Sequence, residues 1–470
     1  MHRRTTETAT PRTAPSPRTP PRRPARRTAA PFGAALCAVT TLTLLGTAAL
    51  PAAANAPAAA PRSVSAHAQS PAAAPIVTRD DHPRSEALRA ALAGLPDDEA
   101  TAAVVLAGGR DGRFEGSAGV RDIRSGRESL ADGRIRAGSL TKVVNASVVL
   151  QLAAEDRLSL DSTVQELLPG LLTDAFTHPV TVRNLLNHTS GIQAGAGLNG
   201  PWEEQYAHRF DRLPVAEVVR TAVAKGPAFA PGEQQQYLNI NYTLLALIVE
   251  KVTGRPFEAE ATRRVLGPLG MRASYFPGDE VGIRGAHNRG YQLVDGVHVD
   301  VTRWRMTDRW AAGDLVSSPA DLERLLVGVF TGAAVPRTQL EEMFTVPDID
   351  GATMSAGLER FDLGDGKVVW GKSGARPGYN AGIAATRDLS RTVVYGVTGT
   401  TAKESGGPVA ARFGIPAFGL AERPARRATG RPVRPVRPVA PRAAAHPVRR
   451  PVPAQTPHRS APGTRPGAAP

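Results

Sequence analysis

A serine and a lysine stand three residues apart in the stretch RIRAGSLTKVVN, at Ser139 and Lys142. The chain has six lysines among its 57 basic residues, so arginine is its usual cation and each lysine needs a reason. Lysine loses its proton when it is buried beside other cations, whereas arginine stays charged. A serine hydroxyl becomes a good nucleophile when a neighbouring base takes its proton. The spacing therefore pairs a potential nucleophile with a potential base.

The apolar run after this pair predicts a helix that begins at Ser139. Lys142 would then lie about one turn further on and on the same side of the helix. The alternative is purely structural, with Ser139 capping the helix and Lys142 on its surface. A single S-x-x-K pair does not decide between the two interpretations.

Two further patterns change that balance, because each occurs once and all three stand in a fixed order. The Y-x-N pattern is at Tyr237 and Asn239, after the predicted loop FAPGEQQQ. The Lys-Ser/Thr-Gly pattern is Lys372-Ser373-Gly374, at the end of a predicted strand. Taken singly, Tyr237 and Asn239 could be loop residues and the lysine a charge at a strand edge. Taken together, the three patterns favour an active site.

With these motifs the chain resembles the penicillin-recognising serine hydrolases, in particular class C β-lactamases and soluble D-alanyl-D-alanine carboxypeptidases. The stretches TVRNLLNHTSGI, FAPGEQQQYLN, LGPLGMRASYF and AAGDLVSSPADLERLL are similar to landmarks of that family. The resemblance covers about residues 80–400. It implies hydrolysis through an acyl-enzyme, without a cofactor or metal ion.

The resemblance also implies a role for each motif. Ser139 would attack the carbonyl carbon of a peptide, ester or β-lactam. The base would be Lys142 or Tyr237, whose phenol would be acidified by Lys142 and Lys372 on either side. Which of the two takes the serine proton stays open.

The remaining motif residues would bind the substrate. Asn239 would hydrogen-bond to the substrate amide, and the Lys372-Ser373-Gly374 motif would meet a substrate carboxylate. The backbone N–H groups of Ser139 and Ala375 would form the oxyanion hole, in which preorganised donors stabilise the charge of the transition state.

Two departures from the family pattern bear on the substrate. Position 375 is alanine, where carboxypeptidase relatives often carry a second hydroxyl. Relatives that trim peptidoglycan also tend to have an arginine near AGLERFDL that reads the terminal carboxylate. The matching position here is Glu359, with Arg360 beside it. Either Arg360 takes that role or the carboxylate is read less strongly.

The two ends of the core predict the strands of one sheet. A helix over SEALRAALAGL precedes the strands TAAVVLAGG and GRFEGSAGV, and GKVVWGKSG, NAGIAATRD and RTVVYGVTG are three more strands. A closing helix follows over GPVAARFGIPAFGLA, which we expect Pro416 to interrupt. The middle, about residues 139–345, has mostly helical patterns. The expected fold is α/β (α+β), an antiparallel sheet flanked by helices with an inserted, mostly helical subdomain.

Charge and composition divide the chain into four parts. Residues 1–56 have an arginine-rich start, an uncharged apolar run and a small-residue end, which predicts a secretory signal peptide, or an uncleaved membrane anchor. Residues 57–77 are expected to be an Ala/Pro-rich linker and residues 78–420 the serine hydrolase domain. Residues 421–470 carry a net charge of +10 and predict a disordered Pro/Arg/Ala tail. We expect secretion, or attachment to the cell wall.

The formal net charge of +14 belongs to the two ends, because residues 78–420 carry −4. A nucleic-acid partner is therefore not expected. The tail is either a solubilising segment or a polycation that binds anionic cell-wall polymers. No H-E-x-x-H or G-x-S-x-G motif is present, which argues against a metal hydrolase and an ordinary α/β-hydrolase. His188 is expected to organise a loop.

The sequence thus predicts an exported serine hydrolase, most simply a monomer that acts on peptidoglycan stem peptides as a D-Ala-D-Ala carboxypeptidase. A class C-like β-lactamase or an esterase is the alternative within the same chemistry. A protein of another class, a non-catalytic sensor of muropeptides or β-lactams, would keep the cleft without the reaction. The polar groups of all three motifs are present, which argues against the sensor.

Overall fold

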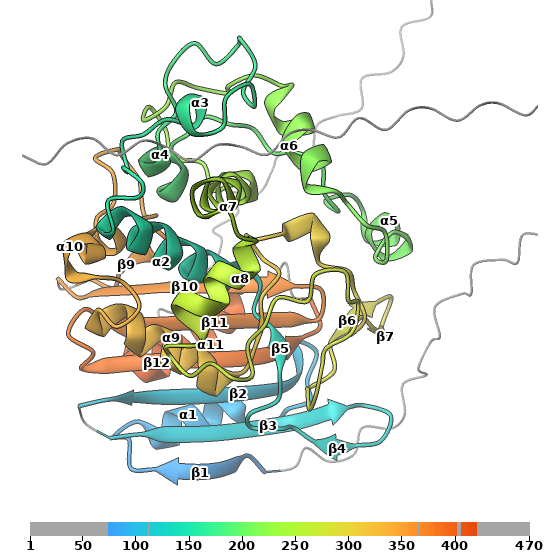
Figure 1. Ribbon diagram of the computed structural model, residues 1–470. Helices are drawn as coiled ribbons and strands as arrows, with labels where there is room; N and C mark the ends of the chain where they lie inside the picture. Colours follow the sequence, from blue (N-terminus) through green and yellow to red (C-terminus); the bar gives the residue numbers. More distant parts are fainter. Residues whose placement is uncertain (1–73, 111, 365, 402–405, 421–470) are drawn as a thin grey trace, which may run out of the picture. The chain divides into compact units, whose positions relative to one another are not determined.

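The computed structural model describes residues 74–110, 112–364, 366–401 and 406–420 (Figure 1). Its main sheet has eight strands in the order β1-β3-β2-β12-β11-β10-β9, with β4 paired to β3. The central pair, β2 with β12, joins the two ends of the domain in an antiparallel ladder. The predicted antiparallel sheet is confirmed. Its strands are β1 (Ile76–Asp80), β2 (Ala100–Gly109), β3 (Phe114–Asp122), β4 (Arg127–Glu128), β9 (Glu359–Asp362), β10 (Val368–Arg376), β11 (Tyr379–Thr386) and β12 (Arg391–Gly399).

Helices cover both faces of this sheet. Successive side chains of a strand point to opposite faces, so Val105 packs in one hydrophobic cluster and Leu106 in the other. Helices α1 (Ser85–Leu92) and α11 (Gly406–Phe418) share the cluster of Val105, and α2 (Thr141–Ala154) and α9 (Pro319–Thr331) share that of Leu106. A strand covered on both sides reads as a continuous apolar run, which explains the sequence of β2.

The middle of the chain adds a helical part next to the sheet (Figure 1). Helix α2 lies between the sheet and α7, and it is buried almost all round because it packs on both. The other helices are α3 (Val164–Leu167), α4 (Val182–Leu186), α5 (Trp202–Ala207), α6 (Val215–Val223), α7 (Asn239–Thr253), α8 (Phe257–Ala261) and α10 (Arg337–Leu340), with 3₁₀ turns at Gly138–Leu140, Thr307–Arg309 and Glu341–Phe344 and a π-helical turn at Thr262–Leu266.

The helical part also contains short strands that periodicity alone does not predict. Strand β5 (Ile135–Arg136) pairs with β8 (Val316–Ser317), and β6 (Tyr291–Val294) forms a hairpin with β7 (Val297–Asp300). The hairpin turns at Asp295 and Gly296, both with positive φ (48° and 76°). An Asp-Gly pair between apolar residues is a strong hairpin signal, so this turn was readable from the sequence.

The edges of the domain differ slightly from expectation. Strand β1 begins at Ile76, inside the segment 57–77 expected to be a linker, and pairs with β3. The expectation that Pro416 interrupts the closing helix was wrong, since α11 continues to Phe418. Pro416 lacks the N–H that would bond to the carbonyl four residues earlier, so it removes one intrahelical hydrogen bond, and only two helical residues follow it.

Several expectations concern residues outside the described part of the chain. The signal peptide (1–56), most of the linker and the basic tail (421–470) lie there. Among the described helices, none is both long and apolar enough to span a bilayer.

Candidate active site

Ser139 lies in a tight turn that presses against β10. Strand β5 ends at Arg136, and the 3₁₀ turn Gly138–Leu140 leads into α2. Gly138 has φ +56°, and a Cβ at this position would lie 2.6 Å from the backbone nitrogen of Ala375. A Cβ on Gly374 would lie 2.7 Å from the nitrogen of Ser139. Glycine is needed at both positions because the two backbones touch.

This contact brings the two expected oxyanion donors together. Strand β9 pairs with β10 only from Val368 to Gly371, and no other strand of the described residues covers the rest of that edge of β10. The edge lies beside the Ser139 turn, with the N–H groups of Ser139 and Ala375 close to one another. Two adjacent N–H groups beside a nucleophile are the arrangement that stabilises an oxyanion.

Lys142 is fully buried in the first turn of α2 and reaches back to the serine. Its Nζ lies 3.2 Å from Ser139 Oγ and donates to Asn239 Oδ1 at 2.7 Å and to the carbonyl of Ala312 at 2.6 Å. Burial, together with the nearby charge of Lys372, outweighs the opposing effect of Tyr237 and lowers the pKa of Lys142 to about 8. A substantial fraction of Lys142 is therefore neutral at mildly alkaline pH and able to accept a proton.

Tyr237 lies between the two lysines. Its ring centroid is 4.9 Å from Lys142 Nζ and 4.7 Å from Lys372 Nζ. Burial raises the pKa of Tyr237, but the charges of Lys142 and Lys372 outweigh it and bring the pKa to about 8. Its hydroxyl is buried and makes no hydrogen bond of normal geometry among the described residues, but it lies near enough to Ser139 and Lys142 for both to help lower its pKa. The structure thus contains two titratable groups poised near the same pH, as a coupled pair.

The other motif residues surround this pair. Asn239 is the first residue of α7, and because its Oδ1 is occupied by Lys142, its amide nitrogen remains for a substrate. Lys372, Ser373, Gly374 and Ala375 are consecutive on β10.

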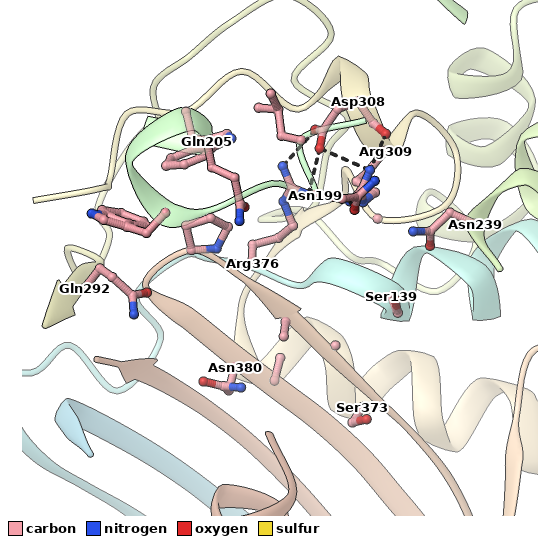
Figure 2. Close-up of a pocket in the computed structure, with 18 of the residues that line it drawn as sticks. Ser139, Asn199, Gln205, Asn239, Gln292, Asp308, Arg309, Ser373, Arg376 and Asn380 are labelled. Atoms are coloured by element: carbon pink, nitrogen blue, oxygen red, sulfur yellow. Dashed lines mark hydrogen bonds and ion pairs between the residues drawn. The ribbon is translucent and has the colours of Figure 1, made fainter. Parts of the chain in front are cut away.

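These residues line a cavity of about 710 Å³ (Figure 2), a volume typical of small-molecule sites. Ser139, Tyr237 and Asn239 line it from the helical part, and the β10 residues line it from the sheet. The structure therefore brings together eight of the nine sequence-predicted site residues, with Lys142 directly behind Ser139.

Arg360 is the exception. It lies on β9, opposite Trp370 of β10, with its side chain 39% exposed and its guanidinium 3.7 Å from the carboxylate of Asp362. It is not among the described residues that line the cavity. Its suggested role in reading a substrate carboxylate has no support in this geometry, because a residue must reach the substrate to bind it.

His188 is placed as a loop residue. It is buried with φ +63°, its backbone carbonyl accepts from Gln236 N–H at 2.9 Å, and its Nδ1 lies 3.1 Å from the side-chain nitrogen of Asn241. Burial holds the pKa of His188 well below its usual value, so the ring is neutral. Its ring packs against Tyr237, with centroids 4.6 Å apart. The histidine therefore shapes the segment that carries Tyr237.

The cavity also contains residues that sequence reasoning missed. Asp308 and Arg309, from a 3₁₀ turn, and Arg376, which follows Ala375 on β10, line the side away from Ser373 together with Asn199 and Gln205 (Figure 2). Arg376 directly follows the third motif, which was a usable signal. The others lie in segments without a motif and had none.

An antiparallel sheet between helix layers, with a Ser-x-x-Lys turn packed on a strand that carries Lys-Ser-Gly, is the architecture of the β-lactamase-fold serine hydrolases. A family model described as Beta-lactamase matches residues 88–412. The chain belongs to this family.

Several curated relatives match part of the chain. Esterase EstB of Burkholderia gladioli is 34% identical over 169 residues, which are 33% of this chain and 41% of the relative. Penicillin-binding protein 4 of Amycolatopsis lactamdurans is 31% identical over 160 residues, 34% of this chain and 40% of the relative. The matched region thus spans less than half the length of either relative.

Solved structures match over more of the domain. A D-stereospecific amidohydrolase from a Streptomyces species is 30% identical, with a TM-score of 0.61, over 70% of this chain and 98% of that one. A penicillin-binding protein homologue from Pyrococcus abyssi is 26% identical, with a TM-score of 0.59, over 68% and 74% of the two chains. A D-amino acid amidase from Ochrobactrum anthropi, at 21% identity and a TM-score of 0.59, shares the fold.

Proposed function

We propose that this protein hydrolyses peptide bonds next to D-amino acids through an acyl-enzyme on Ser139, as a D-Ala-D-Ala carboxypeptidase-type enzyme. The observation that carries the proposal is the 3.2 Å contact between Ser139 Oγ and Lys142 Nζ, at a cavity where the backbone nitrogens of Ser139 and Ala375 adjoin. The likeness to a D-stereospecific amidohydrolase supports substrates of D configuration.

Acylation would proceed as follows. Neutral Lys142 takes the proton of Ser139 Oγ, and the oxygen attacks the substrate carbonyl carbon. The negative charge moves to the carbonyl oxygen, where the N–H groups of Ser139 and Ala375 stabilise it. Lys142 is the proposed base because its nitrogen lies 3.2 Å from Oγ. The Tyr237 hydroxyl, whose pKa is also lowered by hydrogen bonding to Ser139 and Lys142, is left for the second proton transfer.

Collapse of the tetrahedral intermediate breaks the C–N bond, and the leaving amine needs a proton. Tyr237 is the proposed donor, with its proton replaced from Lys142 through the coupled pair. In deacylation, water attacks the ester carbon, its proton goes to the base, and Ser139 Oγ leaves with a proton. Asn239 and the edge of β10 hold the substrate meanwhile.

Mass spectrometry after incubation with penicillin and with a peptide ending in D-Ala-D-Ala tests this function. We expect a penicillin adduct on Ser139, loss of one D-alanine from the peptide, and neither in Ser139→Ala. An adduct on another residue would refute the assignment of the nucleophile. An intact peptide with no adduct would favour the non-catalytic sensor.

The match to an esterase keeps a second candidate open. If the enzyme is an esterase, short-chain esters will be hydrolysed far faster than the peptide. If it is a class C-like β-lactamase, the penicillin adduct will be short-lived and hydrolysed drug will accumulate. The three activities share Ser139 and differ in which acyl-enzyme forms and how fast water attacks it.

Export and wall binding belong to the same proposal. The signal-like segment 1–56 supports secretion, and the +10 charge of residues 421–470 supports binding to anionic wall polymers. Deleting residues 421–470 should leave turnover of a small substrate unchanged and reduce wall association at low salt, since salt screens exposed charges. Wall association that survives both deletion and high salt would refute the role of the tail.

A further inference from the structure

The described residues that line the cavity carry an excess of positive charge. Three cationic side chains, Arg309, Lys372 and Arg376, accompany one carboxylate, that of Asp308. Lys142 adds a buried ammonium behind Ser139. Neither Lys142 nor Lys372 forms an ion pair with a carboxylate in the part of the chain that the structure describes. A cavity with this balance attracts anions.

The one carboxylate is already used by Arg376. Both terminal nitrogens of Arg376 lie near it, with Nη2 2.8 Å from Asp308 Oδ1 and Nη1 3.3 Å from Oδ2. The two side chains are 7% and 4% exposed, so this is a buried, bidentate ion pair. Arg376 and Asp308 therefore neutralise each other to a large extent and form a fixed part of the wall.

Among the residues that the structure describes, Arg309 has no carboxylate partner other than the shared Asp308. Its Nη1 lies 3.3 Å from Asp308 Oδ2 and donates to the Asp308 backbone carbonyl at 3.0 Å, while Nη2 donates to Asn199 Oδ1 at 2.6 Å. These contacts hold the guanidinium in place without supplying a second negative charge (Figure 2). Burial lowers the pKa of Arg309, and the charge of Arg376 lowers it further against the opposing effect of Asp308. An incoming anion would relieve this imbalance.

Arg309 is also close to the reacting serine. A Cβ on Gly313 would lie 3.2 Å from Arg309 Cβ and 3.9 Å from the carbonyl carbon of Gly138, the residue before the nucleophile. Gly313 therefore lies between the Cβ of Arg309 and the turn that carries Ser139. The side chain is 15% exposed, enough for contact with a substrate in the cavity.

We propose that Arg309, positioned by Asp308 and Asn199, binds a carboxylate of the substrate and makes the enzyme selective for anionic peptides. This inference rests on the proposed function and names the substrate class of the same site. The carboxylate has two possible sources. It is either the C-terminal group of the leaving residue or an acidic side chain on the acyl side of the scissile bond. Arg309 would thus bind the substrate carboxylate, the role that the sequence suggested for Arg360.

Binding to the Ser139→Ala variant tests the proposal without any reaction. Three peptide probes would be titrated by calorimetry: one ending in D-Ala-D-Ala, the same peptide with a C-terminal amide, and that amide with D-glutamate on the acyl side. We expect at least one anionic probe to bind about ten- to a hundredfold more tightly than the neutral amide, as one charge-assisted hydrogen bond provides. Equal affinity for all three would overturn the proposal before any further variant is made.

Arg309→Gln in the same background then identifies the residue. It should abolish the preference for the anionic probe, because the charge-assisted hydrogen bond to the carboxylate is lost. The affinity for the neutral amide should stay within about twofold, because the amide does not make that hydrogen bond. Asp308 keeps its bidentate partner Arg376, so the wall should stay folded. Arg303→Gln is the matched control, because Arg303 is exposed, lies in the same segment and does not line the cavity. A preference that survives Arg309→Gln, or equal weakening of all three probes, would overturn the role of Arg309.

The outcome is separable from the proposed function. Loss of preference in the Ser139→Ala background supports the anion site even if the wild type forms no acyl-enzyme. Conversely, an acyl-enzyme on Ser139 of the wild type, together with equal binding of the three probes, keeps the function and rejects the anion site.

Discussion

Tyr237→Phe separates the roles of the two titratable groups at the site. The substitution removes one oxygen atom, which is buried and makes no hydrogen bond of normal geometry among the described residues. Removing such an atom costs little stability, because no hydrogen bond of normal geometry is lost and a desolvated polar group disappears. The melting temperature should therefore be unchanged or slightly higher, and any change in activity reflects the chemistry.

The size of the effect on Lys142 follows from the distance between the groups. Lys142 Nζ lies 4.9 Å from the centre of the Tyr237 ring, and two unit charges about 5 Å apart interact by roughly 3.3 kcal/mol at an effective dielectric constant of about 20, or about 2.4 pKa units. Tyr237 raises the pKa of Lys142, which is about 8 in the intact site. Without Tyr237, Lys142 should lose its proton at lower pH. If Lys142 is the acylation base, the ascending limb of the pH–rate profile should move to lower pH.

A comparison of two substrates shows whether Tyr237 acts as the general base or as the general acid. A 4-nitrophenyl ester has a leaving group that needs no proton, whereas a D-alanine amide does. Tyr237→Phe should therefore reduce kcat/KM for the amide by about 10²–10⁴-fold and for the ester far less, as loss of a general acid predicts. Profiles of kcat/KM against pH for both substrates provide the test. An equal collapse on ester and amide, with no shift of the limb, would show that Tyr237 is the base and refute the role given to Lys142.

Three further outcomes follow from the same geometry. The acylation rate of the wild type should rise with pH with a midpoint near 8, because the deprotonated fraction of the Lys142–Tyr237 pair grows through that range. Stopped-flow acylation by a fluorescent penicillin measures this rate. A rate that stays constant from about pH 6 to 10 would contradict the prediction. Lys142→Arg should lower the acylation rate by about 10²-fold or more, since arginine keeps the charge and holds its proton; near-normal acylation would mean that position 142 needs only a cation. Arg360→Ala should change kcat/KM by about twofold or less on peptide and ester alike, because an exposed ion pair outside the cavity is worth little; a selective loss on the peptide would restore Arg360 as a carboxylate reader.

The part of the site that could be predicted from the sequence is the part held by local backbone. Ser139 and Lys142 are one helical turn apart, and Lys372 to Ala375 are neighbours on one strand. Their relative placement depends on helix and strand geometry, which the apolar patterns around them already indicate. The antiparallel sheet was predictable for a similar reason, since the apolar runs at both ends of the domain had to be buried together.

The wall of the cavity could not be predicted in that way. Arg309 and Asn199 are 110 residues apart and meet only because two irregular segments lie side by side. Loops carry no periodicity, so nothing in their sequence states which partner they will meet. Arg360 is the opposite case, a residue that the sequence placed at the site and the structure does not. Counting residues along the chain placed it near the site, but the pairing of β9 with β10 leaves it half-exposed and outside the cavity.

The sequence by itself determined that a serine, two lysines and a tyrosine are present in the order that an acyl-enzyme site requires. The tertiary structure decided how acidic Lys142 and Tyr237 are. Lys142 and Tyr237 have pKa values near 8 because folding buries Lys142, Tyr237 and Lys372 within a few ångströms of one another. Desolvation and charge proximity are properties of the packed molecule, and neither exists in the unfolded chain.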